Sequence, residues 1–168
     1  MEPPIKVLVV GDGSVGKTSW LSVLLNNSFS NDYNPTQGVE VHSYTSNYLD
    51  SIFQYSLWDC SGHPNHLGLF DGYYIGAQAA IIFYDCTSYH TKSAASFYKR
   101  NINRALFNIT IIIVQNKTDL IENLPEISEP AISVSAKRKI NILEPIKKLD
   151  EYFANKKIIQ NWDDANKF

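Results

Sequence analysis

Residues 5–19 read IKVLVVGDGSVGKTS, and this stretch decides the fold. The apolar run Ile5–Val10 is typical of a buried strand, and Lys17–Asn27 has the pattern of a helix. Between them, residues 11–19 match GxxxxGK[ST], the pattern of a phosphate-binding loop. The glycines let successive backbone N–H groups point at one anion, and the helix adds its positive N-terminal end. Strand, loop and helix together predict a nucleoside triphosphate site.

Two side chains of this loop have expected roles of their own. Lys17 is expected to reach the β- and γ-phosphates, and the Thr18 hydroxyl is expected to hold Mg²⁺. A glycine-rich turn without a ligand is the alternative, and the strand and helix that bound the match disfavour it. The other residues expected to bind the nucleotide from this loop are Gly11, Asp12, Gly13, Ser14, Val15, Gly16 and Ser19.

Composition limits the classes of function that the chain can have. Its 168 residues fit one domain, residues 1–168, and the formal net charge of -2 gives no general attraction to nucleic acid. We therefore expect no direct nucleic-acid partner. Only Cys60 and Cys86 are present, which favours a reducing compartment. The ends carry no lipidation pattern and the apolar stretches are short, so we expect an intracellular protein without a membrane anchor.

Short apolar runs alternate with longer amphipathic segments. The runs AAIIFY and ITIIIV are apolar at successive positions, as expected for strands of a mostly parallel sheet that is covered on both faces. Asp50-Ser51 predicts one antiparallel hairpin. The sequence thus predicts an α/β fold of the P-loop type, with helices on both faces of six strands. The predicted strands are Ile5–Val10, Val39–Tyr48, Ile52–Trp58, Ala79–Tyr84, Ile109–Val114 and Ala131–Val134.

The last helix is predicted to begin at Asn141. Its side chain can cap the helix, Glu144 can complete a capping box, and Pro145 then falls in the first turn, where proline is tolerated. Further along, Ile146, Leu149 and Phe153 recur at helical spacing, so we expect them to face the core.

A second motif, Asp59-Cys60-Ser61-Gly62, closes the strand Ile52–Trp58. A carboxylate at this strand end is placed to hold Mg²⁺ through water, and the Gly62 N–H can meet a γ-phosphate. After a phosphate-binding loop, this spacing is typical of a nucleoside triphosphatase. A zinc cluster of Cys60, His63 and His66 is the alternative, but no fourth ligand is evident.

A third motif, Asn116-Lys117-Thr118-Asp119, follows the strand Ile109–Val114. Asp119 can accept hydrogen bonds from guanine N1–H and the 2-amino group, and it would be left unpaired beside adenine. The motif therefore predicts selectivity for guanine. Ser135-Ala136-Lys137 is expected to add a backbone N–H from Ala136 toward the guanine oxygen, and Phe29 to press on the base edge.

The loop Tyr33–Gly38 precedes the second predicted strand, and Tyr33 is counted among the nucleotide-binding residues. If the Thr36 hydroxyl ligates Mg²⁺ and its N–H contacts the γ-phosphate, the loop is ordered with GTP and released with GDP. Thr36 would then complete a metal set with Thr18 and Asp59. The alternative is an ordinary surface threonine.

With these elements in order, the chain resembles the Ras superfamily of small GTPases. The stretches GVEVH (38–42), LWD (57–59) and residues 71–88 are similar to its Ran branch, the GTPases of nuclear transport. The resemblance implies hydrolysis of GTP to GDP and phosphate, and a location in nucleus and cytoplasm. It also implies importin-β-type transport receptors, an exchange factor and a GTPase-activating protein as partners. It implies Lys17, Thr18, Thr36, Asp59 and Gly62 around phosphate and Mg²⁺, and Asn116, Lys117, Asp119, Ala136 and Lys137 around guanine.

His63 departs from this resemblance, because small GTPases usually carry there the glutamine that orients the attacking water. Imidazole offers one acceptor and one donor, imidazolium loses the acceptor, and Pro64 biases His63 toward extended backbone angles. We therefore expect slow hydrolysis by a catalytic set of Lys17, Thr36, Gly62 and His63. The alternative function is a GTP-locked interaction module that mimics or sequesters Ran partners.

Two further departures concern partner binding. Leu124-Pro125 and Glu129-Pro130 interrupt any helix of useful length between Asp119 and Ser135, where Ran carries a helix and a basic patch used by receptors. The sequence also lacks the acidic tail of Ran. We therefore expect receptor binding to be less secure than nucleotide binding.

Overall fold

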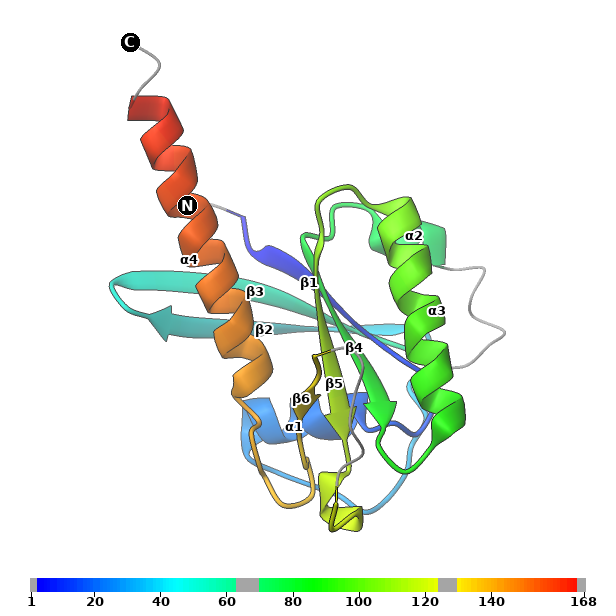
Figure 1. The fold of residues 1–168 in the computed structure, drawn as a ribbon. Coiled ribbons are helices and arrows are strands. Elements are labelled where there is room, and N and C mark those ends of the chain that lie inside the picture. Colours follow the sequence, from blue (N-terminus) through cyan, green and yellow to red (C-terminus); the bar gives the residue numbers. More distant parts are fainter. Residues whose placement is uncertain (1–2, 63–69, 124–129, 166–168) are drawn as a thin grey trace.

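The computed structural model describes residues 3–62, 70–123 and 130–165, which form a sheet between two layers of helices (Figure 1). The sheet has six strands in the order β2-β3-β1-β4-β5-β6, and all neighbours are parallel except β2 and β3. The predicted six-stranded, mostly parallel α/β fold is confirmed. The strands are β1 (Ile5–Val10), β2 (Val39–Tyr48), β3 (Ser51–Cys60), β4 (Ala79–Asp85), β5 (Thr110–Asn116) and β6 (Ile132–Ser133).

The predicted strand bounds agree for β1 and β2, and the other four differ by one or two residues. The antiparallel hairpin predicted at Asp50-Ser51 is confirmed with its turn one residue earlier, at Leu49-Asp50, since Tyr48 of β2 pairs with Ser51 of β3. Leu49 takes the left-handed conformation in the two-residue turn, with φ 51°. This conformation suits the twist of a tight hairpin.

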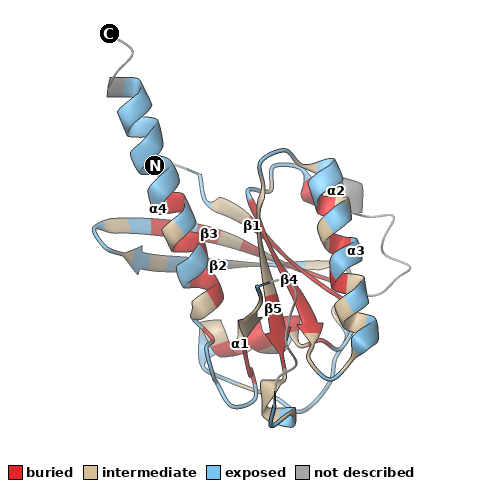
Figure 2. Cartoon of the chain, in the orientation of Figure 1, coloured by how far each residue is buried: buried red, intermediate tan, exposed pale blue. Residues whose placement is uncertain are grey.

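The helices in the described residues are α1 (Lys17–Asn26), α2 (Phe70–Tyr74), α3 (Tyr89–Ala105) and α4 (Glu144–Ala165), with a 3-10 turn η2 (Thr118–Leu120) after β5. Helices α1 and α4 cover one face of the sheet, and α2 and α3 cover the other. Alternate residues of β1 supply both cores: Val7 and Val9 face α1 and α4, whereas Leu8 and Val10 face α2 and α3. Figure 2 shows the buried residues concentrated along these strands.

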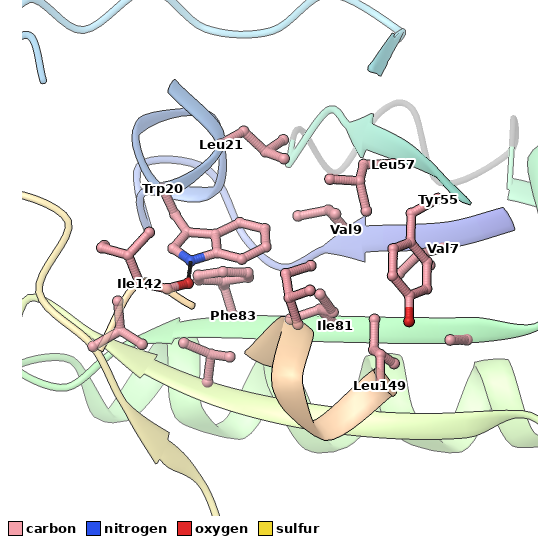
Figure 3. Close-up of a cluster of buried hydrophobic side chains, with 14 of the residues drawn as sticks. Val7, Val9, Trp20, Leu21, Tyr55, Leu57, Ile81, Phe83, Ile142 and Leu149 are labelled. Atoms are coloured by element: carbon pink, nitrogen blue, oxygen red, sulfur yellow. Dashed lines mark hydrogen bonds between the residues drawn. The ribbon is translucent and has the colours of Figure 1, made fainter. Parts of the chain in front are cut away.

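Trp20 of α1 is the largest fully buried side chain of the core between the sheet and helices α1 and α4, and Figure 3 shows its ring beside Phe83 and Ile142. Its ring centroid is 5.2 Å from that of Phe83, and its indole N–H donates to the carbonyl of Ile142 at 2.9 Å. The indole thereby ties the helix that follows the phosphate loop to the segment between β6 and α4. That segment carries Ala136 and Lys137, so this core contact helps to position both ends of the predicted site.

The predicted start of the last helix is wrong by three residues, because α4 begins at Glu144. Asn141 takes the left-handed conformation with φ 55°, and its side-chain amide donates to the Ser133 carbonyl at 2.9 Å instead of capping the helix. Pro145 nevertheless lies in the first turn, as predicted. The expected core residues are buried: Ile146, Leu149 and Phe153 are 1%, 0% and 5% exposed.

Candidate nucleotide-binding site

The loops that follow β1, β3, β5 and β6 meet at the carboxyl-terminal edge of the parallel strands, where they line an open cleft of about 1310 Å³. Most of the predicted nucleotide-binding residues line it. These are Asp12, Gly13, Ser14, Gly16, Lys17, Thr18, Ser19, Phe29, Tyr33, Thr36, Gly62, Asn116, Lys117, Asp119, Ala136 and Lys137. Gly11, Val15 and Ser135 are buried behind this lining and contribute through contacts with it.

The phosphate loop is packed so closely that glycine is required at Gly11 and Gly16 of the loop and at Gly62 beside it. Gly11 has φ +143°, and a Cβ built on it would lie 2.3 Å from the Phe83 carbonyl oxygen. Gly16 has φ +93°, and a Cβ built on it would lie 2.3 Å from Asn116 Nδ2. Gly62 approaches the loop from β3, and its Cβ would lie 2.3 Å from the backbone nitrogen of Gly13. The backbones of the first and second motifs are therefore in direct contact. Because these positions carry no side chain, nothing separates their backbone from a bound phosphate.

Lys17 is 6% exposed, and its ammonium donates to the carbonyl oxygens of Gly11 at 2.9 Å and Asp12 at 2.8 Å. Burial lowers the pKa of this lysine, although Asp59 counteracts the shift. Among the residues that the structure describes, no carboxylate forms an ion pair with it. A buried ammonium held only by carbonyl dipoles favours an anionic ligand, so the loop fits a phosphate group.

The three predicted metal-binding side chains lie together at the end of β3. The Thr18 hydroxyl donates to Asp59 Oδ2 at 2.6 Å, and Thr36 Oγ1 lies 2.9 Å from Thr18 Oγ1. Burial raises the pKa of Asp59, opposed by the Thr18 hydrogen bond and Lys17. Asp59 Oδ1 is buried and accepts no hydrogen bond within the described ranges. Two hydroxyls beside an orphaned carboxylate oxygen are the hard oxygen donors that suit Mg²⁺.

Asn116 joins the phosphate end of the cleft to the opposite end. Its Nδ2 donates to the carbonyl of Val15 at 3.0 Å, and its Oδ1 accepts from the Ala136 N–H at 3.2 Å. The side chain is 1% exposed. A buried amide that satisfies both loops fixes the distance between them, so the cleft has a set length.

Asp119 lies at that opposite end, and its Oδ1 accepts a short hydrogen bond from the Ser135 hydroxyl. Ser135 is fully buried, and its oxygen also accepts from the Arg138 N–H at 3.0 Å. Ser135 was expected to contact the nucleotide; in the structure it orients the carboxylate that faces the cleft. One carboxylate held in this way can present an oxygen to two neighbouring N–H donors.

Beyond this geometry, a model of the Ras family matches residues 6–152. The chain belongs to the Ras family. Ras-family proteins bind GTP or GDP with Mg²⁺, hydrolyse GTP, and respond to exchange factors and activating proteins. The chain is therefore a GTP-binding switch of the GTP-hydrolysing class, and its α/β sheet is the P-loop GTPase fold.

Within this Ras-family site, Asp85 is a residue that the sequence reasoning did not single out. It ends β4 at the same edge as the motifs and forms a close ion pair with Lys117. Burial by itself would raise the pKa of Asp85, but hydrogen bonds from Lys117 and Thr87 lower it below the usual value. The ion pair holds Lys117 over the cleft. The signal was available, because Asp85 directly follows the buried run Ala79–Tyr84.

Asp12 also behaves differently from a simple phosphate-loop residue. Its backbone carbonyl accepts from Lys17, but its carboxylate points to α3, where His90 Nε2 lies 3.5 Å from Oδ2. The Tyr98 hydroxyl hydrogen-bonds to the same carboxylate. Asp12 therefore attaches the phosphate loop of this Ras-family chain to α3. No spacing in the sequence indicated His90 or Tyr98 as its neighbours.

The remaining predictions for this region concern residues beyond the described ranges. His63, Pro64 and His66 lie outside them, as do Leu124, Pro125 and Glu129, so the roles given to these residues stay predictions. Cys60 is described: its thiol lies 3.4 Å from the Trp58 carbonyl, and burial raises its pKa to about 12.

The described residues hold no group of three or more His, Cys, Asp or Glu side chains that could bind a metal ion.

No helix in the described part of the chain is both long enough and apolar enough to cross a membrane.

Proposed function

We propose that this Ras-family chain is a Ran-like switch of one domain that hydrolyses GTP slowly. The observation that carries the proposal is the opposition of two charges along one cleft: buried Lys17 at one end and the Asp119 carboxylate at the other. A nucleoside triphosphate with an N–H-bearing base edge matches that arrangement. Asn116 supports it by holding the two ends at a set distance.

In the proposed complex, Asp119 accepts from guanine N1–H and the 2-amino group, while the Ala136 backbone lies beside the guanine oxygen. Phe29 presses on the base edge, and Lys137 covers its face. Lys17 and the loop backbone hold the phosphates. Thr18, Thr36 and Asp59 would hold Mg²⁺, which when bound neutralises phosphate charge. Thr36 and Gly62 then sense the γ-phosphate and set the conformation that partners recognise.

Hydrolysis would be in-line attack by water on the γ-phosphate, with Lys17 stabilising the charge that develops. His63 replaces the usual glutamine, so we expect slow turnover and a weak response to an activating protein. Single-turnover GTP hydrolysis should be about a hundredfold faster in a His63→Gln variant, at the lower end of the roughly 10²–10⁴-fold range for one positioned catalytic group. If the original chain and the variant hydrolysed GTP at equal rates, both with and without activator, His63 would be removed as the cause.

The proposed partners are importin-β-type receptors in the nucleus and cytoplasm. Binding of such a receptor is measured by titration in the GDP form and with a non-hydrolysable GTP analogue. A switch requires different affinities in the two states, and equal affinities would overturn this proposal. Nucleotide selectivity, measured separately with GTP and ATP, tests the site itself.

The second candidate is a GTP-locked module that sequesters Ran partners, favoured by the His63-Pro64 pair. The two candidates differ in the nucleotide that the isolated protein retains. Chromatography of the nucleotide released by denaturation separates them: retained GTP supports the locked module, and GDP supports the working enzyme.

A further inference from the structure

The C-terminal half of α4 carries large apolar side chains that face away from the core. Ile158, Ile159 and Trp162 are 64%, 61% and 70% exposed. Figure 1 shows this half of the helix extending past the sheet, and Figure 2 shows it exposed. Apolar side chains gathered on one exposed helix surface are the usual mark of an interaction site.

Helical geometry places these three residues on one side of α4. At 3.6 residues per turn they span an arc of about 100°, roughly opposite to the face that packs against the sheet. Lys157 marks that packed face, because its Nζ lies 5.3 Å from the ring centroid of Phe53 in β3. The arc of Ile158, Ile159 and Trp162, called here the outer face, therefore cannot turn inward without moving the whole helix.

Two opposite charges flank one edge of the outer face. Lys156 and Asp163 are both exposed, and they lie seven residues apart, which is two helical turns and about 10 Å along the axis. This spacing is too long for the two to pair within one helix. Their positions are, however, nearly equidistant from the middle of the outer face. If a second α4 lies antiparallel across it, Lys156 of each copy comes opposite Asp163 of the other.

We propose that the outer face is a self-association surface that binds a second copy of this chain in an antiparallel, two-fold arrangement. A two-fold interface joins the same patch on both copies, so it requires a surface that is complementary to itself. Here the cation and anion exchange partners across the axis, and the isoleucines and Trp162 pack between them. A helix that lies on a membrane would carry basic residues on both flanks; Asp163 and Asp164 beside Trp162 disfavour that occupant.

The size of the surface sets the expected strength. About ten residues of each copy take part, against 20–30 a side in a standard interface, so the dimer is weak, with a dissociation constant on the order of 100 μM. The nucleotide cleft lies at the other end of the molecule, beside η2, where Figure 1 places the loops after β1 and β5. Self-association therefore leaves the cleft open, and its test is independent of the proposed function.

Sedimentation equilibrium of the full chain, from about 5 to 500 μM, measures the dimer directly. Lys156→Glu and Asp163→Lys each replace two attractions per dimer by two repulsions, so each is expected to weaken the dimer about tenfold. An equimolar mixture of the two variants regains both attractions and should form heterodimers at about the original affinity. The double variant K156E/D163K should also associate as the original chain does.

Glu122→Lys is the matched control, since it makes the same acid-to-lysine change at an exposed side chain just after η2, far along the chain from the outer face. It should leave the dimer unchanged, and circular dichroism of every variant checks that α4 remains folded. A chain that stays monomeric at 500 μM overturns the proposal. So do a control that weakens the dimer as much as Asp163→Lys, variants that do not complement each other, and recruitment of the monomer to vesicles containing phosphatidylserine.

Discussion

Two buried carboxylates, one on helix α4 and one at the end of strand β3, differ in how many of their oxygens accept hydrogen bonds. Asp150 of α4 is 2% exposed, and both its oxygens are satisfied: Ser46 donates to Oδ2 at 2.6 Å and Tyr55 to Oδ1 at 2.7 Å. Asp59 at the end of β3 is 0% exposed, yet in the described part of the chain only its Oδ2 accepts hydrogen bonds.

This difference separates a carboxylate that serves the fold from one that serves a ligand. Burying a carboxylate is costly unless hydrogen bonds or a counter-charge compensate. At Asp150 the protein supplies that compensation itself and joins α4 to β2 and β3. At Asp59 the protein leaves one oxygen open beside the Thr18 and Thr36 hydroxyls. Asp119 is intermediate, since Ser135 holds one oxygen while the carboxylate faces the cleft.

The largest effect is expected at Asp119, the carboxylate that is proposed to bind the guanine base. Asp119→Ala removes two hydrogen bonds to a charged acceptor, each worth about 1.5–3 kcal/mol, so the preference for GTP over ATP should fall about 10³-fold. Competition binding with both nucleotides measures it. Asp32→Ala is the control, because it removes another carboxylate that lines the cleft without a predicted base contact. An unchanged preference would falsify the assignment of the guanine end.

At Asp150 the expected loss is in stability alone. Asp150→Ala leaves the buried Tyr55 hydroxyl and the Ser46 hydroxyl without their acceptor. The free energy of unfolding should therefore fall by about 3 kcal/mol, roughly a hundredfold in the folding equilibrium. Urea denaturation gives this value, and Tyr55→Phe should cost less because it removes one partner only. GDP affinity of the folded variant should not change. A marked loss of affinity would mean that Asp150 is coupled to the site.

Asp59→Asn should have the opposite effects to Asp150→Ala: it should raise the stability of the protein and weaken ligand binding. Burial disfavours the charged form of this carboxyl and so raises its pKa. The amide removes that charge, so the nucleotide-free protein should become more stable by about 1 kcal/mol. The same change removes an anionic oxygen from the proposed Mg²⁺ site, and the gain in GDP affinity on adding Mg²⁺ should shrink about tenfold. Denaturation without nucleotide and GDP titration at two Mg²⁺ concentrations measure both. If the variant were less stable and its Mg²⁺ response intact, Asp59 would belong with Asp150.

The fold could be predicted from the sequence because its main signals are local. A buried parallel strand is apolar at every position, and a loop that must wrap around an anion needs glycine at set spacings. These signals fixed the strands and the three motifs. The motifs then had to meet, because parallel strands end at one edge of the sheet. The structure brings Thr18 and Asp59 together as that argument requires. Thr36 joins them because β2 is antiparallel to β3 and begins where β3 ends.

What the sequence could not show depends on tertiary contacts. Asn141 and Glu144 have the spacing of a capping box, but the Ser133 carbonyl competes for the Asn141 amide and the helix begins three residues later. The attachment of Asp12 to α3 likewise depends on how the phosphate loop packs against His90. The motif predicted that Ser135 contacts the nucleotide. In the structure Ser135 is buried, and its hydroxyl donates a hydrogen bond to Asp119.

The smallest effect is expected at Asp85, a third kind of carboxylate, whose charge is compensated by the cation of Lys117. The Asp85 side chain is 13% exposed and pairs with Lys117, and hydrogen bonds hold its pKa below the usual value despite partial burial. A lowered folded-state pKa adds stability above the unfolded pKa of about 3.9, and this is lost as the pH falls through the folded value. Asp85→Asn should therefore cost about 1 kcal/mol at pH 7 and nothing once both pKa values are passed.

Urea denaturation of the original chain and the variant, from pH 7 to the most acidic pH at which both remain folded, tests this. The stability difference should be constant near neutrality and narrow only below about pH 4. A Lys117→Met background should reduce the difference at pH 7, because the cation that compensates Asp85 is gone. If the stability difference grew as the pH fell, the charge of Asp85 would be disfavoured by burial, as that of Asp59 is. Lys117 would then be held by other contacts.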